Sequence, residues 1–136
     1  MIEGRCLCGA AGWTLHGEPE DTTVCNCSAC RRYGAVWAYG HVGELLALTG
    51  PTTAFSKPDH PYLAFRFCGT CGSVLAWVGL HEEPDGRTRM AVNLRLALEP
   101  AEVRDLELKH FEGAASFEDV VPEDPGVARH VRDLWF

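Results

Sequence analysis

No stretch of the 136-residue sequence approaches the roughly 18 uninterrupted apolar residues that a membrane-spanning helix needs, so no membrane partner is expected. Basic residues are also few, since 12 lysines and arginines stand against 19 aspartates and glutamates, for a formal net charge of −7. Because non-specific binding of nucleic acid needs a basic face, no nucleic-acid partner is expected. The N-terminal residues lack the apolar segment of a secretory signal, and we therefore expect a cytoplasmic protein.

Internal repeats and long helix-forming segments are missing as well. Short stretches rich in β-branched and aromatic residues are broken by glycine, proline and aspartate at close intervals, which indicates a mainly β domain that resembles an antiparallel sandwich. The length fits a single domain over residues 1–136. A Pro-Asp-Gly turn is expected at 84–86. Strands are expected over residues 11–16, 36–42, 45–49, 53–55, 62–67, 73–80 and 89–94.

Two short helices are expected. Residues 27–33 can form a helical turn that ends at Gly34. Near the C-terminus, Asp124 can cap a helix whose first residue is Pro125, and we expect this helix to pack against the domain without a chemical role. The residues expected on its buried face are Val127, Val131 and Leu134.

Cysteine is the residue that the sequence has in unusual number. Seven cysteines in a chain without an export signal are more often metal ligands or catalytic thiols than disulfide partners, with a disulfide framework as the plainer alternative. They form three groups, which are Cys6 with Cys8, then Cys25, Cys27 and Cys30, and finally Cys68 with Cys71.

The spacing of these groups predicts two metal sites. Soft thiolates favour zinc, with copper(I) and iron–sulfur clusters as competitors. A Cys-x-x-Cys turn such as Cys68 to Cys71 lets two sulfurs converge on one ion, and the following Gly72 can adopt backbone angles that direct amides at sulfur. Four sulfurs close a tetrahedron and three leave a position open, so the N-terminal pair joins either Cys68 and Cys71 or Cys25 and Cys27. We favour the first division, because the three central cysteines are close enough to form a site unaided.

The open three-sulfur site is the candidate for chemistry. Cys27 and Cys30 would share one face of a helical turn, and the neighbouring Arg31 and Arg32 would favour thiolates there. Either arginine could bind a carboxylate through a bidentate fork, or both could simply face solvent. A zinc ion with a vacant position can bind an external thiolate or polarise an oxygen. The alternatives are three thiols without metal, or a static second zinc completed by His41, His60 or His110.

Two further features favour structural roles. Asn93-Leu94-Arg95 could line a cleft, although a turn-forming asparagine is the plainer interpretation. The tryptophans expected in the core are Trp13, Trp37 and Trp77.

Four segments in chain order carry a wider pattern. They are Cys-x-Cys-Gly from residue 6, Cys-x-Cys-Ser-x-Cys-Arg-Arg-x-Gly-Ala from residue 25, Phe-Cys-x-x-Cys-Gly from residue 67 and Val-Asn-Leu-Arg from residue 92. This pattern, over about residues 2–112, resembles the glutathione-dependent formaldehyde-activating enzyme family, which includes centromere-protein-V-like proteins. Residues 113–136 would form a C-terminal extension that contains the short helix.

The resemblance implies a Mss4-like fold, in which small antiparallel sheets surround zinc, and it implies two zinc ions per chain. The implied activity is that of a carbon–sulfur lyase that joins formaldehyde and glutathione in S-hydroxymethylglutathione, so the expected partner is a small thiol or thiol–aldehyde adduct. A non-catalytic, zinc-stabilised thiol- or metal-binding protein is the alternative. The implied site residues are Cys6, Cys8, Cys68 and Cys71 for a structural zinc, and Cys25, Cys27 and Cys30 for an open catalytic zinc. From their charge, we further expect Arg31 or Arg32 to hold a glutathione carboxylate.

Overall fold

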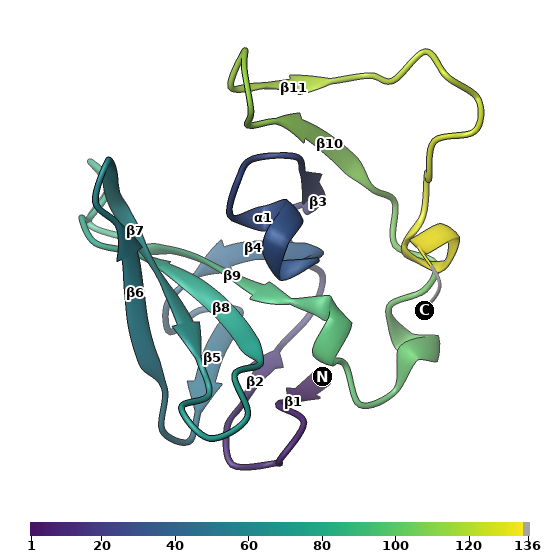
Figure 1. The fold of residues 1–136 in the computed structure, drawn as a ribbon. Coiled ribbons are helices and arrows are strands. Elements are labelled where there is room, and N and C mark those ends of the chain that lie inside the picture. The colour runs from purple at the N-terminus through teal and green to yellow at the C-terminus, as the bar shows by residue number, and fades with distance from the viewer. Residues whose placement is uncertain (135–136) are drawn as a thin grey trace.

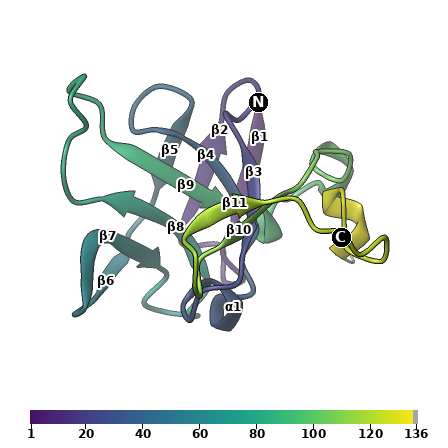
Figure 2. The same ribbon diagram turned by 90° about the horizontal axis from the view of Figure 1, so that it is seen from above.

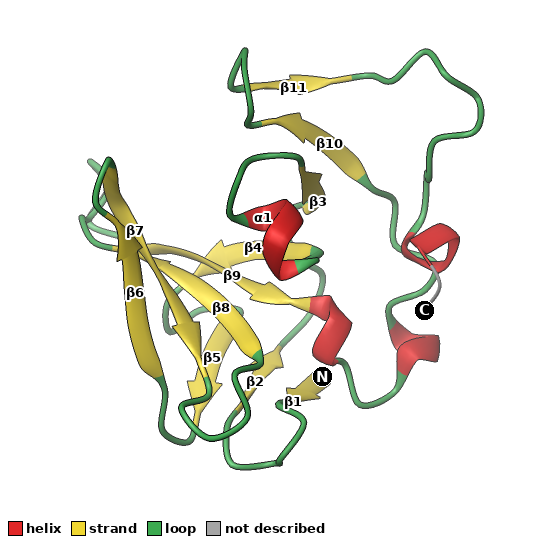
Figure 3. Ribbon diagram, in the orientation of Figure 1, coloured by secondary structure: helices red, strands yellow, loops and turns green. Residues whose placement is uncertain are grey.

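The computed structural model describes residues 1–134, which form eleven short strands and little helix (Figures 1 and 3). The strands are β1 Ile2–Arg5, β2 Gly12–Leu15, β3 Thr22–Cys25, β4 Trp37–His41, β5 Leu46–Thr49, β6 Thr53–Lys57, β7 His60–Phe67, β8 Val74–Gly79, β9 Arg89–Asn93, β10 Lys109–Glu112 and β11 Glu118–Val120. The helical elements are α1 Cys30–Tyr33 and the 3-10 turns η1 Leu94–Leu96, η2 Pro100–Glu102 and η3 Val131–Leu134.

The strands build two sheets, which confirms the predicted mainly β architecture. A three-stranded sheet has the order β1-β2-β5, and an eight-stranded sheet has the order β11-β10-β3-β4-β9-β8-β7-β6. Neighbouring strands run antiparallel except β3 and β10, which run parallel. The seven expected strands correspond to β2 and β4 to β9, whereas β1, β3, β10 and β11 were not expected. No helix in the described part of the chain has the length and apolarity that a membrane crossing needs.

The central strands β4 and β9 separate two apolar cores. Successive side chains of a strand point to opposite faces of the sheet. Trp37 and Ala91 therefore pack in one core, and their neighbours Ala38 and Val92 pack in the other. The core that contains Ala38 is the larger one, and the small sheet adds buried side chains to it, including that of Trp13.

The cysteines divide between these two cores. Cys6 and Cys68 are buried in the larger core, and Cys71 packs against it. Cys30 is buried in the smaller core, with Cys25 and Cys27 packed against that one. The fold therefore sorts the cysteines into two groups that pack in different cores.

The short helix α1 forms where the sequence predicts a helical turn. Its bonding begins with the Arg31 N–H, which donates to the Cys27 carbonyl at 3.1 Å. It ends at Gly34, which adopts the left-handed conformation with φ 59° and donates to the Cys30 carbonyl. A left-handed residue at this position is the ordinary end of a helix.

The C-terminal segment is less helical than predicted. Only Val131–Leu134 is helical, as a 3-10 turn, and the Asp124 carboxylate accepts the Gly126 N–H at 2.8 Å in a local turn. The backbone between these points is used differently, because the Leu108 N–H donates to the Arg129 carbonyl at 2.8 Å. Pairing with the chain before β10 thus replaces the first turns of the expected helix.

The hairpin β10–β11 extends the large sheet beyond β3. Strand β10 pairs with β3 in a register that sets Phe111 beside Cys25. Figure 2 shows the hairpin lying over β3, and the Asn26 N–H donates to the Phe111 carbonyl at 3.4 Å. The end of this hairpin therefore reaches the segment that contains the central cysteines.

Candidate metal centres and the adjoining cavity

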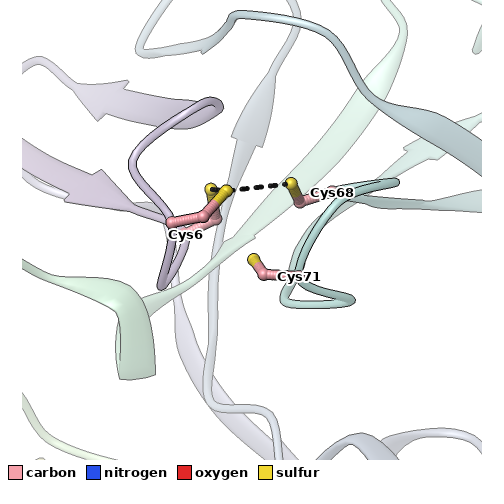
Figure 4. A group of neighbouring side chains, drawn as sticks. Cys6, Cys68 and Cys71 are labelled. Carbon is pink, nitrogen blue, oxygen red and sulfur yellow. Dashed lines mark hydrogen bonds between the residues drawn. The ribbon is translucent and has the colours of Figure 1, made fainter.

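The first cysteine group consists of Cys6, Cys8, Cys68 and Cys71, whose Sγ atoms all lie within 4.8 Å of one another. Their side chains converge from two turns of the chain (Figure 4). The Cys8 Sγ lies 3.6 Å from the Sγ atoms of both Cys6 and Cys68. A tetrahedron of sulfurs about 2.3 Å from zinc has edges of about 3.8 Å, so the spacing fits zinc. None of the seven cysteines forms a disulfide.

Backbone and hydroxyl groups hold these two turns together. The Gly72 N–H donates to the Cys68 carbonyl at 2.8 Å, and Gly72 has φ 77°, the left-handed conformation that favours glycine. The Ser73 hydroxyl lies 3.3 Å from the Cys71 Sγ and accepts the Leu7 N–H at 3.2 Å. Ser73 therefore links the N-terminal turn to the Cys-x-x-Cys turn.

The thiols of this group shift one another's pKa values. Hydrogen bonds from the hydroxyl and amide of Ser73 lower the pKa of the Cys71 thiol to about 5. Despite the Ala10 amide, the neighbouring thiols of the group raise the pKa of Cys8 to about 11. Adjacent thiolates repel one another, so one sulfur retains its proton. A divalent cation would remove this conflict, and the donor set therefore fits a metal ion.

The second group consists of Cys25, Cys27 and Cys30, and its three Sγ atoms also lie within 4.8 Å of one another. The Cys27 N–H donates to the Cys25 Sγ at 3.4 Å, and the Cys30 N–H donates to the Cys27 Sγ at 3.4 Å. The buried indole Nε1 of Trp37 donates to the Cys30 Sγ at 3.2 Å. Among residues 1–134, no histidine or carboxylate completes this group. Three sulfurs with these contacts fit a zinc ion that keeps one position open.

Hydrogen bonding also shifts the thiol pKa values of Cys25 and Cys30 in opposite directions. The bond with Cys30 lowers the pKa of Cys25 to about 6 against the effect of burial, and the amides of Cys27 and Gly113 add to this effect. The same contact with Cys25, together with burial, raises the pKa of Cys30. The contact between these two sulfurs therefore favours the thiolate at Cys25 and the thiol at Cys30.

A cavity of about 470 Å³ adjoins the second group. Its lining includes all three cysteines of the group, is mainly apolar and is rich in aromatic side chains. The prediction that Trp13, Trp37 and Trp77 are core residues is confirmed, since their exposed fractions are 1%, 0% and 8%. Two of them have a second role, because Trp37 and Trp77 line the cavity as well. Other aromatic lining residues are Tyr39, Tyr62, Phe65, Phe111 and Phe117.

The cations that line this cavity are not those that the sequence suggests. Arg31 and Arg32 are exposed on α1, and the described lining of the cavity includes neither. Arg32 instead donates from Nη1 to the Ser28 carbonyl at 2.8 Å. Lys57 and Arg89 do line the cavity, and the Lys57 Nζ donates to the Ser28 Oγ at 3.0 Å. The tip of the β6–β7 hairpin thus touches the cysteine loop.

The three histidines considered as fourth ligands have different positions. His41 is buried, and its two ring nitrogens each lie 2.8 Å from a carboxylate oxygen, one of Glu20 and one of Glu83. These contacts occupy the whole imidazole. His60 lines the cavity, whereas His110 on β10 belongs to neither cysteine group within residues 1–134.

Asn93 has the structural role that its turn-forming nature suggests. Its Oδ1 accepts the Val36 N–H at 3.2 Å and the Arg95 N–H at 3.2 Å, and its Nδ2 donates to the Val74 carbonyl at 2.9 Å. The side chain is buried. It therefore clamps the end of β9 and the start of η1 to their neighbours.

Four residues near the second group were missed by the sequence interpretation. Lys57, Arg89 and Phe117 line the cavity, and the backbone of Gly113 contacts the cysteines. No local motif marks them, because strand pairing over long sequence distances brings each to the site.

Comparison with known proteins adds two findings. The family model described as glutathione-dependent formaldehyde-activating enzyme matches residues 1–104. Among solved structures, the chain is similar to the crystal structure of a protein from Rhodobacter sphaeroides, with 23% sequence identity and a TM-score of 0.56. That alignment covers 74% of this chain and 93% of the other, and it shows a shared fold. A search of curated proteins finds no significant match.

Proposed function

The chain belongs to the glutathione-dependent formaldehyde-activating enzyme family, and we propose that it is a zinc-dependent carbon–sulfur lyase acting on a glutathione–aldehyde adduct such as S-hydroxymethylglutathione. One observation carries the proposal. Three cysteine sulfurs within 4.8 Å of one another line a cavity large enough for a small organic molecule. A reducing compartment such as the cytoplasm would keep these thiols and the substrate thiol available.

The two cysteine groups have different roles in this proposal. Cys6, Cys8, Cys68 and Cys71 hold a structural zinc, and Cys25, Cys27 and Cys30 hold a second zinc as the catalytic residues. When bound at the three-sulfur group, zinc supplies a positive centre that attracts a thiolate or polarises an oxygen. The difference in sulfur number supports this division, because a site closed by four ligands has no position left for a substrate.

The chain's own residues position the ligands and the substrate. The Trp37 indole donates to the Cys30 Sγ and so fixes that side chain in the smaller core. Glutathione has two carboxylates, and the cationic side chains of Lys57 and Arg89 line the cavity where such groups would lie. In the lyase direction the carbon–sulfur bond breaks, the hydroxyl oxygen loses its proton, and the released sulfur gains one. The reaction therefore needs no oxidant or reductant.

The test is an exchange experiment on the zinc-loaded protein. NMR exchange spectroscopy on glutathione, formaldehyde and their adduct measures the interconversion rate with and without protein. We expect the wild type to accelerate this interconversion. The Cys27→Ser variant, in a sample shown to be folded, should not. A rate equal to that of the protein-free mixture, with both zinc ions counted in the sample, would refute the lyase proposal.

The same experiment discriminates between the two pairs of cations. We expect Lys57→Ala combined with Arg89→Ala to weaken the apparent affinity for glutathione about tenfold, as the loss of a charge-assisted hydrogen bond does. The matched control is Arg31→Ala combined with Arg32→Ala, which removes the same charge outside the cavity lining. If this control has the larger effect, Arg31 or Arg32 is the carboxylate contact, as expected from their charge.

The alternative function predicts a different result in the same assay. A non-catalytic thiol- or metal-binding protein would bind glutathione saturably and leave the exchange rate unchanged. Metal content separates both functions from a purely structural role, because each requires two zinc ions per chain whereas a structural role requires one.

A further inference from the structure

The hairpin β10–β11 lies directly on the second cysteine group. A Cβ atom placed on Gly113 would lie 2.6 Å from the Cys25 Sγ and 2.9 Å from the Cys27 Cβ. These distances are shorter than van der Waals contact, so only glycine allows the backbone to pass this close to the sulfurs. This hairpin follows the residues 1–104 that the family model matches. It is therefore a part of the site contributed by the C-terminal end of the chain.

Hydrogen bonds fix the hairpin to the cysteine loop. The Asn26 side chain, between Cys25 and Cys27 in the sequence, donates to the Glu112 carboxylate and accepts the Ala114 N–H at 3.0 Å. The other Glu112 oxygen accepts the Ala115 N–H at 2.8 Å, which closes the turn. The hairpin tip is thus held in one position above the sulfurs.

Phe117 is the unusual residue of this turn. Its φ of 58° is in the left-handed region, and it is the one residue other than glycine with a positive φ among residues 1–134. A side chain with a Cβ pays a conformational cost there, and glycine or asparagine would fit with less strain. The Phe117 ring packs edge-on against Phe111, with ring centroids 4.9 Å apart, and it lines the cavity although it is 68% exposed. The strained backbone therefore holds an exposed aromatic ring at the mouth of the cavity.

We propose that this hairpin determines specificity, because Phe111 and Phe117 form an apolar wall that binds a ring-sized apolar substituent on the aldehyde-derived carbon of the adduct. The inference rests on the proposed function for the identity of the thiol. With the glutathione part of the adduct at Lys57 and Arg89, a hydroxymethyl group is too small to cover the apolar surface that Phe111 and Phe117 add to the cavity lining. Aromatic aldehydes add to a thiol as formaldehyde does, with one carbon–sulfur bond formed and one proton moved to oxygen. Adducts of aromatic or bulky apolar aldehydes are therefore the preferred substrate class.

The experiment compares two stable thioethers that cannot react, S-methylglutathione and S-benzylglutathione. Isothermal titration calorimetry on the zinc-loaded full chain measures the dissociation constant of each. We expect S-benzylglutathione to bind about tenfold more tightly, as burial and stacking of a phenyl ring allow. Phe117→Ala should remove most of this preference and change the affinity for S-methylglutathione less than twofold. Phe55→Ala is the matched control, because Phe55 is 47% exposed on β6 and is outside the described cavity lining.

The other outcomes separate this inference from the proposed function. Equal affinity for the two thioethers, or a preference that survives Phe117→Ala, overturns the inference and leaves the glutathione assignment intact. Binding of benzyl mercaptan that depends on Phe117, with no binding of either glutathione thioether, overturns glutathione as the thiol and supports the apolar wall. If none of the three compounds binds, both proposals fail.

Discussion

Replacing Cys8 by serine tests the first metal site sharply, because nothing else in the structure makes this residue important. The Cys8 side chain is exposed, and its sulfur contacts other cysteines of the group, with Cys6 and Cys68 at 3.6 Å, and the amide of the neighbouring Ala10. Exposed substitutions of this kind usually change stability by no more than about 0.5 kcal/mol. A large loss of stability would therefore have to come from a bound metal.

The expected size of the loss follows from the chain length that the site encloses. Cys8 and Cys68 are 60 positions apart, and a cross-link that closes a loop of this length stabilises the folded state by about 4 kcal/mol. For a domain of this size that corresponds to a decrease in Tm of about 15 °C. Cys25 and Cys30 are only five positions apart. Loop closure by the second site therefore adds about 2 kcal/mol less to the free energy of unfolding than closure of the 60-residue loop does. Cys25→Ser should therefore be clearly milder than Cys8→Ser.

The assay is thermal unfolding of zinc-loaded wild type, Cys8→Ser, Cys25→Ser and Leu7→Ala, with zinc counted in each sample. Leu7 is 90% exposed beside Cys8, and its replacement should leave Tm unchanged within about 2 °C. A chelator, which removes both ions, should reduce the wild type to the Tm of the double variant Cys8→Ser/Cys25→Ser, below that of Cys8→Ser alone. If Cys8→Ser keeps the wild-type Tm, or if Cys8→Ser and Cys25→Ser are equally damaging, the division into a closed and an open site is wrong.

Two other predictions concern residues away from the first site. Gly113→Ala should displace the Cys25 sulfur, since the added Cβ would lie 2.6 Å from it. The metal content of the second site should fall by about half while the first site stays loaded. Atomic absorption measures the zinc content per chain, and Gly126→Ala in the same C-terminal region is the control. For His41, hydrogen bonding to Glu83 raises its pKa against burial, with Glu20 adding to the effect, so its contribution to stability is full below about pH 6.5 and disappears as the pH rises through the raised pKa. Urea unfolding of wild type and His41→Gln across this range should show a difference in free energy that shrinks with increasing pH, and a constant difference would contradict the assigned charge.

The sequence predicts the strands and cysteine groups that local patterns encode. Runs of β-branched and aromatic residues mark the strands, such as β4 and β9, that are buried on both faces, and the turn residues between them delimit each strand. Cysteine spacing predicts the three-sulfur group because Cys25, Cys27 and Cys30 are neighbours in the chain. Prediction of the four-sulfur group required one further assumption, that Cys6 and Cys8 lie close to Cys68 and Cys71 in the folded chain. The structure brings these four sulfurs within 4.8 Å of one another.

The unpredicted parts depend on contacts between distant segments. Strand β10 pairs in parallel with β3 and antiparallel with β11, and its own residues, Lys-His-Phe-Glu, carry no strong strand pattern. The C-terminal helix has suitable capping residues, but pairing of Leu108 with Arg129 satisfies the same backbone groups in an extended form. Lys57 reaches the cysteine loop through the β6–β7 hairpin. Arg31 and Arg32 follow Cys30 directly in the sequence, yet neither is among the described residues that line the cavity. Sequence proximity to a ligand is thus a poor guide to which charges face the site.

The two cysteine groups are connected through β7, although they pack in different cores. Cys68 directly follows the last residue of β7, and at the opposite end of the same strand His60 lines the cavity beside the second group. Phe65, between these ends, is another lining residue and packs in the smaller core. A metal ion that fixes Cys68 therefore also limits the motion of a strand that forms one wall of the cavity. Loss of the first ion should then weaken binding of S-benzylglutathione before the domain unfolds, whereas loss of the second ion should leave β7 in place.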